Sequence, residues 1–422
     1  MDFVLKAILS LVKIKGDKQL RYILGALMCI SVVFVFTSTT VFAYQKQGGN
    51  LTFYPLRHMI FLGLSWLAAA FISKLSTKLF NRFALFICLI GIGLAWITPF
   101  CGVELNGATR WLEIGGIAFQ PSEIAKIALI FFVAKVLSIH KKEPSKAFWP
   151  IVIATAFTVV PIIIANLSTA LLIMSTVLGL MIIGSIPAKK ITALGLVLLC
   201  AGIAYLYLLP QEYQMGRTST WKGRVERFIG LEDDPVEDTG KNFQAEQARL
   251  AVAHSGLLGT GFGMSYVKNF LPMAYSDFIF STILEECGAW GGVIVILVFL
   301  WLLVRAIQVA QRCDSAFEIY LILGLAIIIC LQAFINMAVG VGLIPVTGQT
   351  LPLISMGGTS NVIVGGVMGV MLSISAHNMP KEKVKETPKA KQETIHSEFV
   401  SDDITNDDDE EENIEFSESR DN

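Results

Sequence analysis

Charged residues are scarce in this chain. Only 16% of its 422 residues are Asp, Glu, Lys or Arg, whereas soluble domains average about 25%. The mean hydropathy is +0.63. Because a soluble protein of this length would need more charge at its surface, the composition excludes a soluble globular core and indicates an integral membrane protein.

The chain also lacks the usual signs of a metal or disulfide framework and of a cleaved leader. None of its seven cysteines forms a CxxC pair, which argues against a zinc site or a disulfide framework. The first long apolar run begins only near Tyr22 and is too long for the hydrophobic part of a signal peptide. We therefore expect it to remain as the first membrane span.

Long apolar runs fill most of the chain. A bilayer core about 30 Å thick needs about 20 apolar residues per helix. The pattern predicts an all-α polytopic membrane protein of about ten helices, with nine or eleven left open by the close spacing of runs five to seven. The runs lie near 22–44, 58–74, 83–100, 121–139, 148–165, 167–186, 190–209, 278–306, 316–340 and 358–376.

Lysine and arginine placement predicts the orientation of these helices. With ten spans, the N-terminal segment and every short loop rich in Lys or Arg fall on one side, which is the cytoplasmic side by the positive-inside rule. Both termini are then cytoplasmic, and loops 101–120, 210–276 and 341–357 face outward. We expect a cytoplasmic segment at 1–20, a transmembrane domain at 21–378, and a disordered acidic cytoplasmic tail at 379–422.

A carboxylate stands where the large outer loop between helices seven and eight meets apolar sequence. Asp277 occupies this boundary, and Glu285 and Glu286 follow within the eighth run. A charge at mid-bilayer would cost at least about 2.5–3.5 kcal/mol, so the first turns of this helix are expected to project from the bilayer or to line a cavity. The structural alternative for Asp277 is a helix N-cap.

Three further stretches interrupt the apolar pattern. Pro121 opens the fourth span, where Lys126 lies near Glu123 on one helix face. Asn166 is suited to cap the sixth span. Residues 344–360 combine prolines with Gly, Ser and Thr, which predicts irregular backbone that is buried in protein or lines a watery cavity.

The outer loop contains two features of its own. Residues 243–254 have helical composition and predict a short interfacial helix. Gly259, Gly261 and Gly263 follow, but no strand precedes them, so we interpret them as a flexible turn and not as a nucleotide loop.

Together these stretches resemble the SEDS family (shape, elongation, division and sporulation) of polytopic peptidoglycan polymerases. The resemblance covers roughly residues 20–378, and the charged N-terminus and long tail are more like the division member than the elongation member. The matching elements are 106–111 (NGATRW), 120–123 (QPSE) with Lys126, 259–263 (GTGFG), 271–280 with Glu285, Glu286 and Gly288, and 345–348 (PVTG) with 351–352 and 355–360.

The resemblance implies an activity and partners. It implies that the chain polymerises glycan from lipid II, the undecaprenyl-diphosphate-linked disaccharide peptide, outside the bacterial cytoplasmic membrane. It implies a class B penicillin-binding transpeptidase and other division proteins as partners, and no nucleic acid. Asp277 aligns with the family's essential aspartate, Trp111 with its functional tryptophan and Lys126 with its motif lysine.

The sequence departs from the family pattern beside the aspartate. Met273 and Tyr275 stand where many members have glutamate and histidine, and Asn166 stands where many have aspartate. These departures leave Asp277 as the main titratable candidate and weaken any scheme that needs a second acid beside it.

Glycan polymerisation assigns a role to each candidate. A sugar hydroxyl attacks an anomeric carbon that carries a diphosphate, so Asp277 suits a general base, and Glu285 could assist it or hold a cation. Cationic side chains or a divalent metal ion would stabilise the leaving diphosphate, although no ligand cluster identifies a metal. The candidate substrate-binding residues are Arg110, Trp111, Lys126, Arg224, Arg227 and Glu285.

Structural explanations compete for several of these residues. Trp111 also suits an interfacial anchor, Lys126 a pair with Glu123, and Arg224 and Arg227 a solvated loop face. For the whole protein, a lipid-linked precursor flippase and a non-catalytic division scaffold stay open. A transporter needs charges near mid-bilayer, whereas here the unusual residues gather at the predicted outer side.

Overall fold

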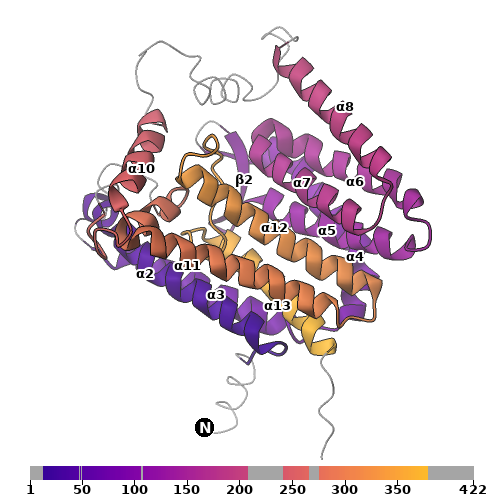
Figure 1. Cartoon of the computed structure of the whole chain (residues 1–422), viewed down its shortest axis with the longest axis horizontal. Coiled ribbons are helices and arrows are strands. Elements are labelled where there is room, and N and C mark those ends of the chain that lie inside the picture. The colour runs from indigo at the N-terminus through magenta and orange to yellow at the C-terminus, as the bar shows by residue number, and fades with distance from the viewer. Residues whose placement is uncertain are drawn as a thin grey trace, which may run out of the picture. The chain divides into compact units, whose positions relative to one another are not determined.

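The computed structural model describes residues 13–46, 48, 50–105, 108–207, 241–265 and 275–378. Arg224, Arg227 and the predicted acidic tail lie outside these ranges. The helices (Figure 1) are α2 Lys18–Lys46, α3 Phe53–Ile72, α4 Thr77–Cys101, α5 Pro121–Ile139, α6 Pro144–Ala165, α7 Leu167–Ile183, α8 Ala188–Tyr207, α10 Lys241–Ser255, α11 Ile279–Ala310, α12 Ala316–Gly340 and α13 Thr359–His377.

Each of the ten predicted apolar runs coincides with one helix, and the predicted short helix in the outer loop is α10. Within the described residues, seven helices are long and apolar enough to cross a membrane: α2, α3, α4, α6, α11, α12 and α13. Helix α7 is apolar but shorter. The predicted fold class, an all-α polytopic membrane protein, is confirmed.

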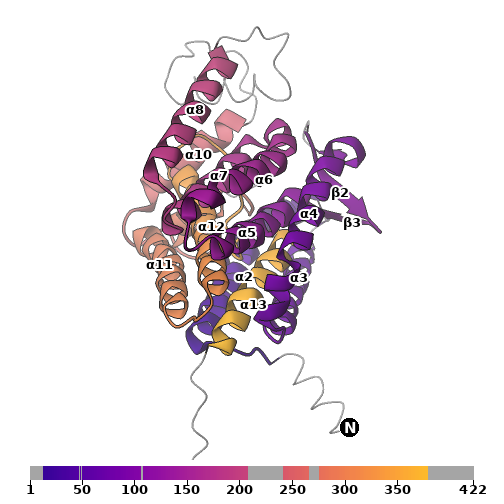
Figure 2. The ribbon, with the colours of Figure 1, turned by 90° about the vertical axis from the view of Figure 1, so that its right-hand side faces the viewer.

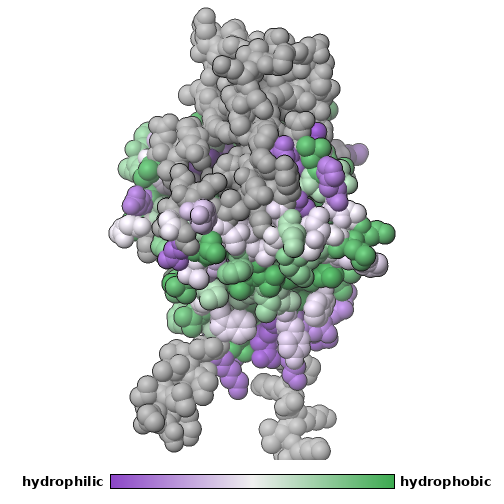
Figure 3. Space-filling view, turned by 90° about the vertical axis from the view of Figure 1, so that its left-hand side faces the viewer, coloured by the Kyte–Doolittle hydropathy of each residue, from purple (hydrophilic) through white to green (hydrophobic). Residues whose placement is uncertain are grey.

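Burial separates central helices from peripheral ones. Helices α12 and α13 bury 67% and 72% of their apolar windows inside the protein, whereas α3 and α4 bury only 28% each. Figure 1 shows α12 crossing the middle of the helix group, where it contacts α11, α5 and α7. On the face seen in Figure 3, hydrophobic side chains form a band above a more hydrophilic zone. Such a band suits lipid contact.

The two ends of the bundle carry different loops. At one end, the backbone N–H groups of Lys15 and Asp17 donate to the hydroxyls of Ser73 (3.2 Å) and Ser375 (2.9 Å). Arg305 Nε donates to Asp17 Oδ1 at 2.9 Å. Figure 2 shows the start of α2 and the end of α13 together at this end. Residues 15–17, the end of α3, the end of α13 and Arg305 therefore lie together at one end of the bundle, and Asp277 precedes α11 at its opposite end.

The loop from residue 255 to 265 packs against α11 where this helix is kinked. Gly288 adopts φ +67° inside the helix, which removes the regular hydrogen-bond pattern there. Thr260 and Gly261 donate their backbone N–H groups to the carbonyls of Glu285 (2.8 Å) and Glu286 (3.0 Å). A Cβ on Gly259 would lie 2.4 Å from Gly288 N. The loop and the helix can approach this closely because residues 259 and 288 are both glycine. The turn that the sequence predicted as flexible is therefore held by a specific backbone contact.

The predicted loop between spans three and four contains a small antiparallel sheet in the order β1-β2-β3. Its strands are β1 Val103–Leu105, β2 Ala108–Ile114 and β3 Ile117–Phe119. Gly115 and Gly116 form the β2–β3 turn with φ of +60° and +79°, which suits a two-residue hairpin of type I′. These strands were not predicted from the sequence.

Candidate functional site

The turn that carries Asp277 is held by three donors at three consecutive carbonyls. Met356 N donates to Tyr275 O at 3.0 Å, Ser355 Oγ to Ser276 O at 2.7 Å, and Asn336 Nδ2 to Asp277 O at 2.9 Å. The backbone of this turn is therefore fixed against α12 and the segment that precedes α13.

The Asp277 carboxylate is partly exposed. Its Oδ1 accepts a hydrogen bond from Ser276 Oγ at 3.1 Å. Gly348 lies opposite, where an added Cβ would be 3.7 Å from Asp277 Oδ2, so the lack of a side chain there leaves room beside the carboxylate. The N-cap residue of α11 is Phe278, without a side-chain cap bond. The N-cap explanation for Asp277 is therefore wrong.

Tyr275 is the first residue of the Asp277 turn and is partly buried. Its ring packs on Phe42, with centroids 5.3 Å apart, and Phe42 also contacts Tyr54. Burial, followed by electrostatic interactions with Tyr54 and Asp277, raises the pKa of the Tyr275 phenol. Tyr275 therefore stays neutral at physiological pH and adds no second charge beside Asp277.

The irregular backbone between α12 and α13 is buried in protein, as the prolines and small polar residues predicted. Leu351, Leu353, Ile354 and Ser355 are fully buried. Asn361 Nδ2 donates to Ser355 O at 2.9 Å, which ties the end of the segment to the start of α13. We refer to residues 341–358 as the re-entrant segment.

Two amides of α12 attach this segment to the helices. Asn336 Nδ2 donates to Gln349 O at 2.7 Å as well as to the Asp277 carbonyl. One turn earlier, Gln332 Nε2 donates to Thr350 O at 3.0 Å. Sequence reasoning missed both residues. Their signal was an amide pair at i and i+4 within an otherwise apolar helix.

Lys126 is buried between α5 and α12. Its Nζ lies 2.7 Å from Glu123 Oε2 and 2.6 Å from Gln332 Oε1. The ion pair with Glu123, one of the two explanations from sequence, is confirmed. Through Gln332, which binds Thr350 O, Lys126 supports the re-entrant segment next to the carbonyl that Asn336 binds.

Arg110 and Trp111 lie next to each other on β2, and both are partly exposed. Arg110 lines a small pocket together with Gln120, Ser122 and Asn166. Asn166 Oδ1 accepts a hydrogen bond from Thr169 N at 3.2 Å, so the predicted cap of α7 is confirmed.

Hydrogen bonds connect this pocket with the Asp277 turn. Thr169 Oγ1 accepts from Gln349 Nε2 at 2.9 Å. Gln349 O in turn accepts from Asn336, which also binds the Asp277 carbonyl. The structure therefore brings the Arg110 and Asp277 regions to the same end of the bundle.

Glu285 is buried beneath loop 255–265, which packs against α11. The Ser265 hydroxyl donates to its Oε2, and Thr260 binds its backbone carbonyl. Glu286 beside it is also buried. In the part of the chain that the structure describes, no group of three His, Cys, Asp or Glu side chains is placed to hold a metal ion.

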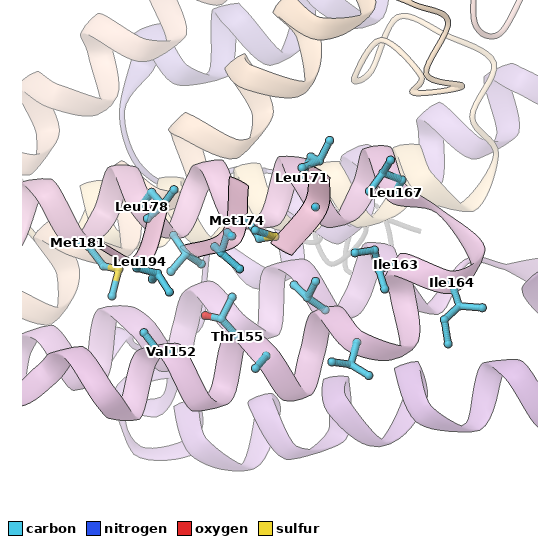
Figure 4. A pocket seen from close by; sticks show the side chains of 16 residues that line it. Val152, Thr155, Ile163, Ile164, Leu167, Leu171, Met174, Leu178, Met181 and Leu194 are labelled. Atoms are coloured by element: carbon cyan, nitrogen blue, oxygen red, sulfur yellow. The ribbon is translucent and has the colours of Figure 1, made fainter. Parts of the chain in front are cut away.

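A large apolar cavity lies between α6, α7 and α8 (Figure 4). Its volume is about 600 Å³. Its walls are almost entirely aliphatic and include Ile163 and Leu167 near the Asp277 end of the bundle and Met181 and Leu194 near the other end. It can accommodate a hydrocarbon chain.

The fold and site define a polytopic membrane protein with a carboxylate-bearing turn and a polar network at one end of its helices. The chain matches the family model of the FtsW/RodA/SpoVE cell cycle proteins over residues 17–379 and belongs to this family. The SEDS resemblance is thereby confirmed, and the protein is a multi-pass protein of the bacterial inner membrane.

Two curated relatives illustrate the similarity. The chain is 34% identical over 369 residues to a protein of Alkalilimnicola ehrlichii named "Probable peptidoglycan glycosyltransferase FtsW", covering 85% of this chain and 88% of the relative. It is 30% identical over 375 residues to stage V sporulation protein E of Bacillus subtilis, covering 87% and 98%.

Two solved structures share the fold. A chain from a study of polymerization and crosslinking by a peptidoglycan synthase complex has a TM-score of 0.70 at 24% identity, covering 87% of this chain and 99% of that one. Thermus thermophilus RodA, a rod shape determining protein, has a TM-score of 0.63 at 22% identity, covering 87% and 98%.

Proposed function

We propose that this protein is a peptidoglycan glycosyltransferase that polymerises lipid II, with Asp277 as the general base. Family membership and the relatives named as such enzymes support the activity. The observation that carries the residue assignment is a partly exposed carboxylate on a turn held at three consecutive carbonyls.

The reaction joins two lipid-linked disaccharides. A hydroxyl oxygen of the acceptor sugar forms a bond to the anomeric carbon of the donor, and the bond from that carbon to the diphosphate breaks. Asp277 takes the hydroxyl proton as the new bond forms, and the lipid diphosphate leaves with its electron pair. Attack from the opposite face inverts the anomeric centre.

Cations must stabilise the charge that gathers on the leaving diphosphate. Arg110, at the same end of the bundle as Asp277, is the candidate within the described residues, and Arg224 and Arg227 are candidates in the outer loop. Lys126 is bound to Glu123 and Gln332, which favours a supporting role over direct contact with substrate.

The polyprenyl tail of the substrate needs an apolar path. The aliphatic cavity between α6, α7 and α8 offers one, about 600 Å³ in volume. Leu167 lines this cavity, and the residue before it, Asn166, lines the Arg110 pocket. The end of the cavity near Leu167 therefore adjoins the Arg110 pocket. A lipid seated there would bring its diphosphate toward that pocket.

We place this activity in cell division, with the Asp277 end outside the cell, both termini cytoplasmic and a class B transpeptidase as partner. The lysine and arginine pattern supports the orientation. The likeness to a chain from a peptidoglycan synthase complex supports a partner.

Reconstitution with lipid II tests the proposal. Purified protein, alone and with its transpeptidase partner, should yield glycan polymer, and Asp277→Asn should not. Asp314→Asn is the matched control, because it removes an exposed carboxylate from the loop at the other end of α11. Polymer from Asp277→Asn would overturn the base assignment, and lipid flipping without polymer from wild type would favour the transport hypothesis.

A further inference from the structure

The hydrogen bonds that fix the Asp277 turn come from residues that are distant in sequence. Ser355 is 79 residues from Ser276, and Asn336 is 59 residues from Asp277. Both donors are buried. Such bonds order a turn only if the donors are themselves fixed, so the question is what holds Ser355 and Asn336.

Ser355 is fixed by its own segment. Its hydroxyl accepts from Leu351 N at 2.8 Å while it donates to Ser276 O at 2.7 Å. Its carbonyl accepts from Asn361 Nδ2 at 2.9 Å. The hydroxyl therefore has one orientation that satisfies both partners, and a rotation would break two bonds at once.

Asn336 is fixed by the geometry of its amide. Both protons of its Nδ2 are used, one toward Asp277 O at 2.9 Å and one toward Gln349 O at 2.7 Å. The side chain therefore fixes the distance between the Asp277 turn and the re-entrant segment. Any shift of one relative to the other breaks a buried hydrogen bond.

We propose that Ser355 and Asn336 are positioning residues for polymerisation, because they set where the Asp277 carboxylate stands relative to the acceptor hydroxyl. This inference rests on the proposed role of Asp277. A displacement of about 1 Å in a catalytic group can reduce the rate by roughly 100-fold. Loss of either donor therefore acts on the chemical step and leaves substrate binding largely intact.

The chain offers a matched control for loss of a buried hydroxyl. Ser281 Oγ donates to Gly340 O at 2.9 Å and joins α11 to α12. It is buried like Ser355, but its hydroxyl bonds to the carbonyl of Gly340 and not to a carbonyl of the Asp277 turn. Ser281→Ala and Ser355→Ala both remove a buried serine-to-carbonyl bond, and only the second removes one from the Asp277 turn.

The experiment combines kinetics with hydrogen exchange on full-length protein reconstituted with lipid II. Ser355→Ala and Asn336→Leu should each lower kcat by roughly 10–100-fold with KM for lipid II within about twofold of wild type. Ser281→Ala should keep kcat within about twofold. Ser355→Thr retains a hydroxyl and should restore most of the rate.

Amide exchange provides a readout independent of activity. Peptides that contain residues 275–280 should exchange faster in Ser355→Ala than in Ser281→Ala. Equal exchange and equal kcat in these two variants would overturn the inference, and so would a loss confined to KM. If Asp277→Asn itself polymerises lipid II, the proposed function fails; if Asp277→Asn is inactive while Ser355→Ala matches Ser281→Ala, only the positioning inference fails.

Discussion

A Cβ at the kink of α11 should destabilise the protein because the loop 255–265 has no room for it. At Gly288, an added Cβ would lie 2.3 Å from Leu257 O and 2.5 Å from Gly259 N, and φ is +67°. These neighbours are backbone atoms, so a side-chain rotation cannot relieve the contact. Gly288→Ala must therefore move the loop away from α11.

Gly256→Ala separates the cost of an unfavourable backbone conformation from the cost of the close contact. Gly256 also has a left-handed φ of +59°, but an added Cβ would meet nothing within 4 Å. Gly256→Ala loses about 1–2 kcal/mol from the left-handed backbone. Gly288 has ψ −168°, a region that essentially only glycine adopts, so Gly288→Ala loses about 1–3 kcal/mol from its backbone. It loses about 1–3 kcal/mol more from overpacking, so its total loss should be about 2–6 kcal/mol.

Thermal unfolding in detergent, followed by circular dichroism, measures this difference. Gly288→Ala should have the lower midpoint, and amide exchange in residues 256–265 should increase because Thr260 and Gly261 lose their carbonyl partners on α11. Equal midpoints for the two variants would refute the reasoning, since they would show that the close backbone approach does not constrain the protein.

Three further outcomes follow from single contacts. Burial alone would raise the pKa of the Asp17 carboxyl, but the hydrogen bond and charge of Arg305 hold it below its ordinary value of 3.8. The stability lost in Asp17→Asn should thus be constant above pH 3.8 and disappear only below it; loss of the difference already at neutral pH would contradict this. Asn166→Ala should cost about 1 kcal/mol as a lost cap of α7, measured by thermal unfolding, and no change would exclude the cap. Lys126→Met should cost about 3–5 kcal/mol by leaving the buried Glu123 carboxylate without its cation, and adding Glu123→Gln should recover part of the midpoint; no recovery would argue against the ion pair as the cause.

The sequence predicted the helices well because the length of an apolar run is a local property. All ten runs coincide with helices, and their bounds agree most closely for α5 and α12. The Asn166 cap was predictable for the same reason, since a cap depends on residues within one helical turn. The strands at 103–119 were not predicted, because each has seven residues or fewer. Such short strands give too few alternating apolar and polar positions to be detected.

The candidate site was predictable only in part. Asp277 was identified by its place between the polar loop and an apolar run, and by the motifs around it. Asn336, Gln332 and Ser355 were not identified. The partners through which they hold the site lie between 13 and 206 residues away, and nothing in the local sequence shows which carbonyl or amine an isolated polar side chain will meet.

By itself, the sequence of this protein predicted a bundle of about ten membrane helices and a carboxylate, Asp277, at the boundary between a polar loop and an apolar run, because both follow from local hydropathy and motif order. Only the tertiary structure decided how that carboxylate is held. The fold brings α12 and the re-entrant segment against residues 275–277, where three carbonyls find three donors. It also decided that Lys126 is buried between Glu123 and Gln332, because a buried charge takes whatever partners the packing of distant helices supplies.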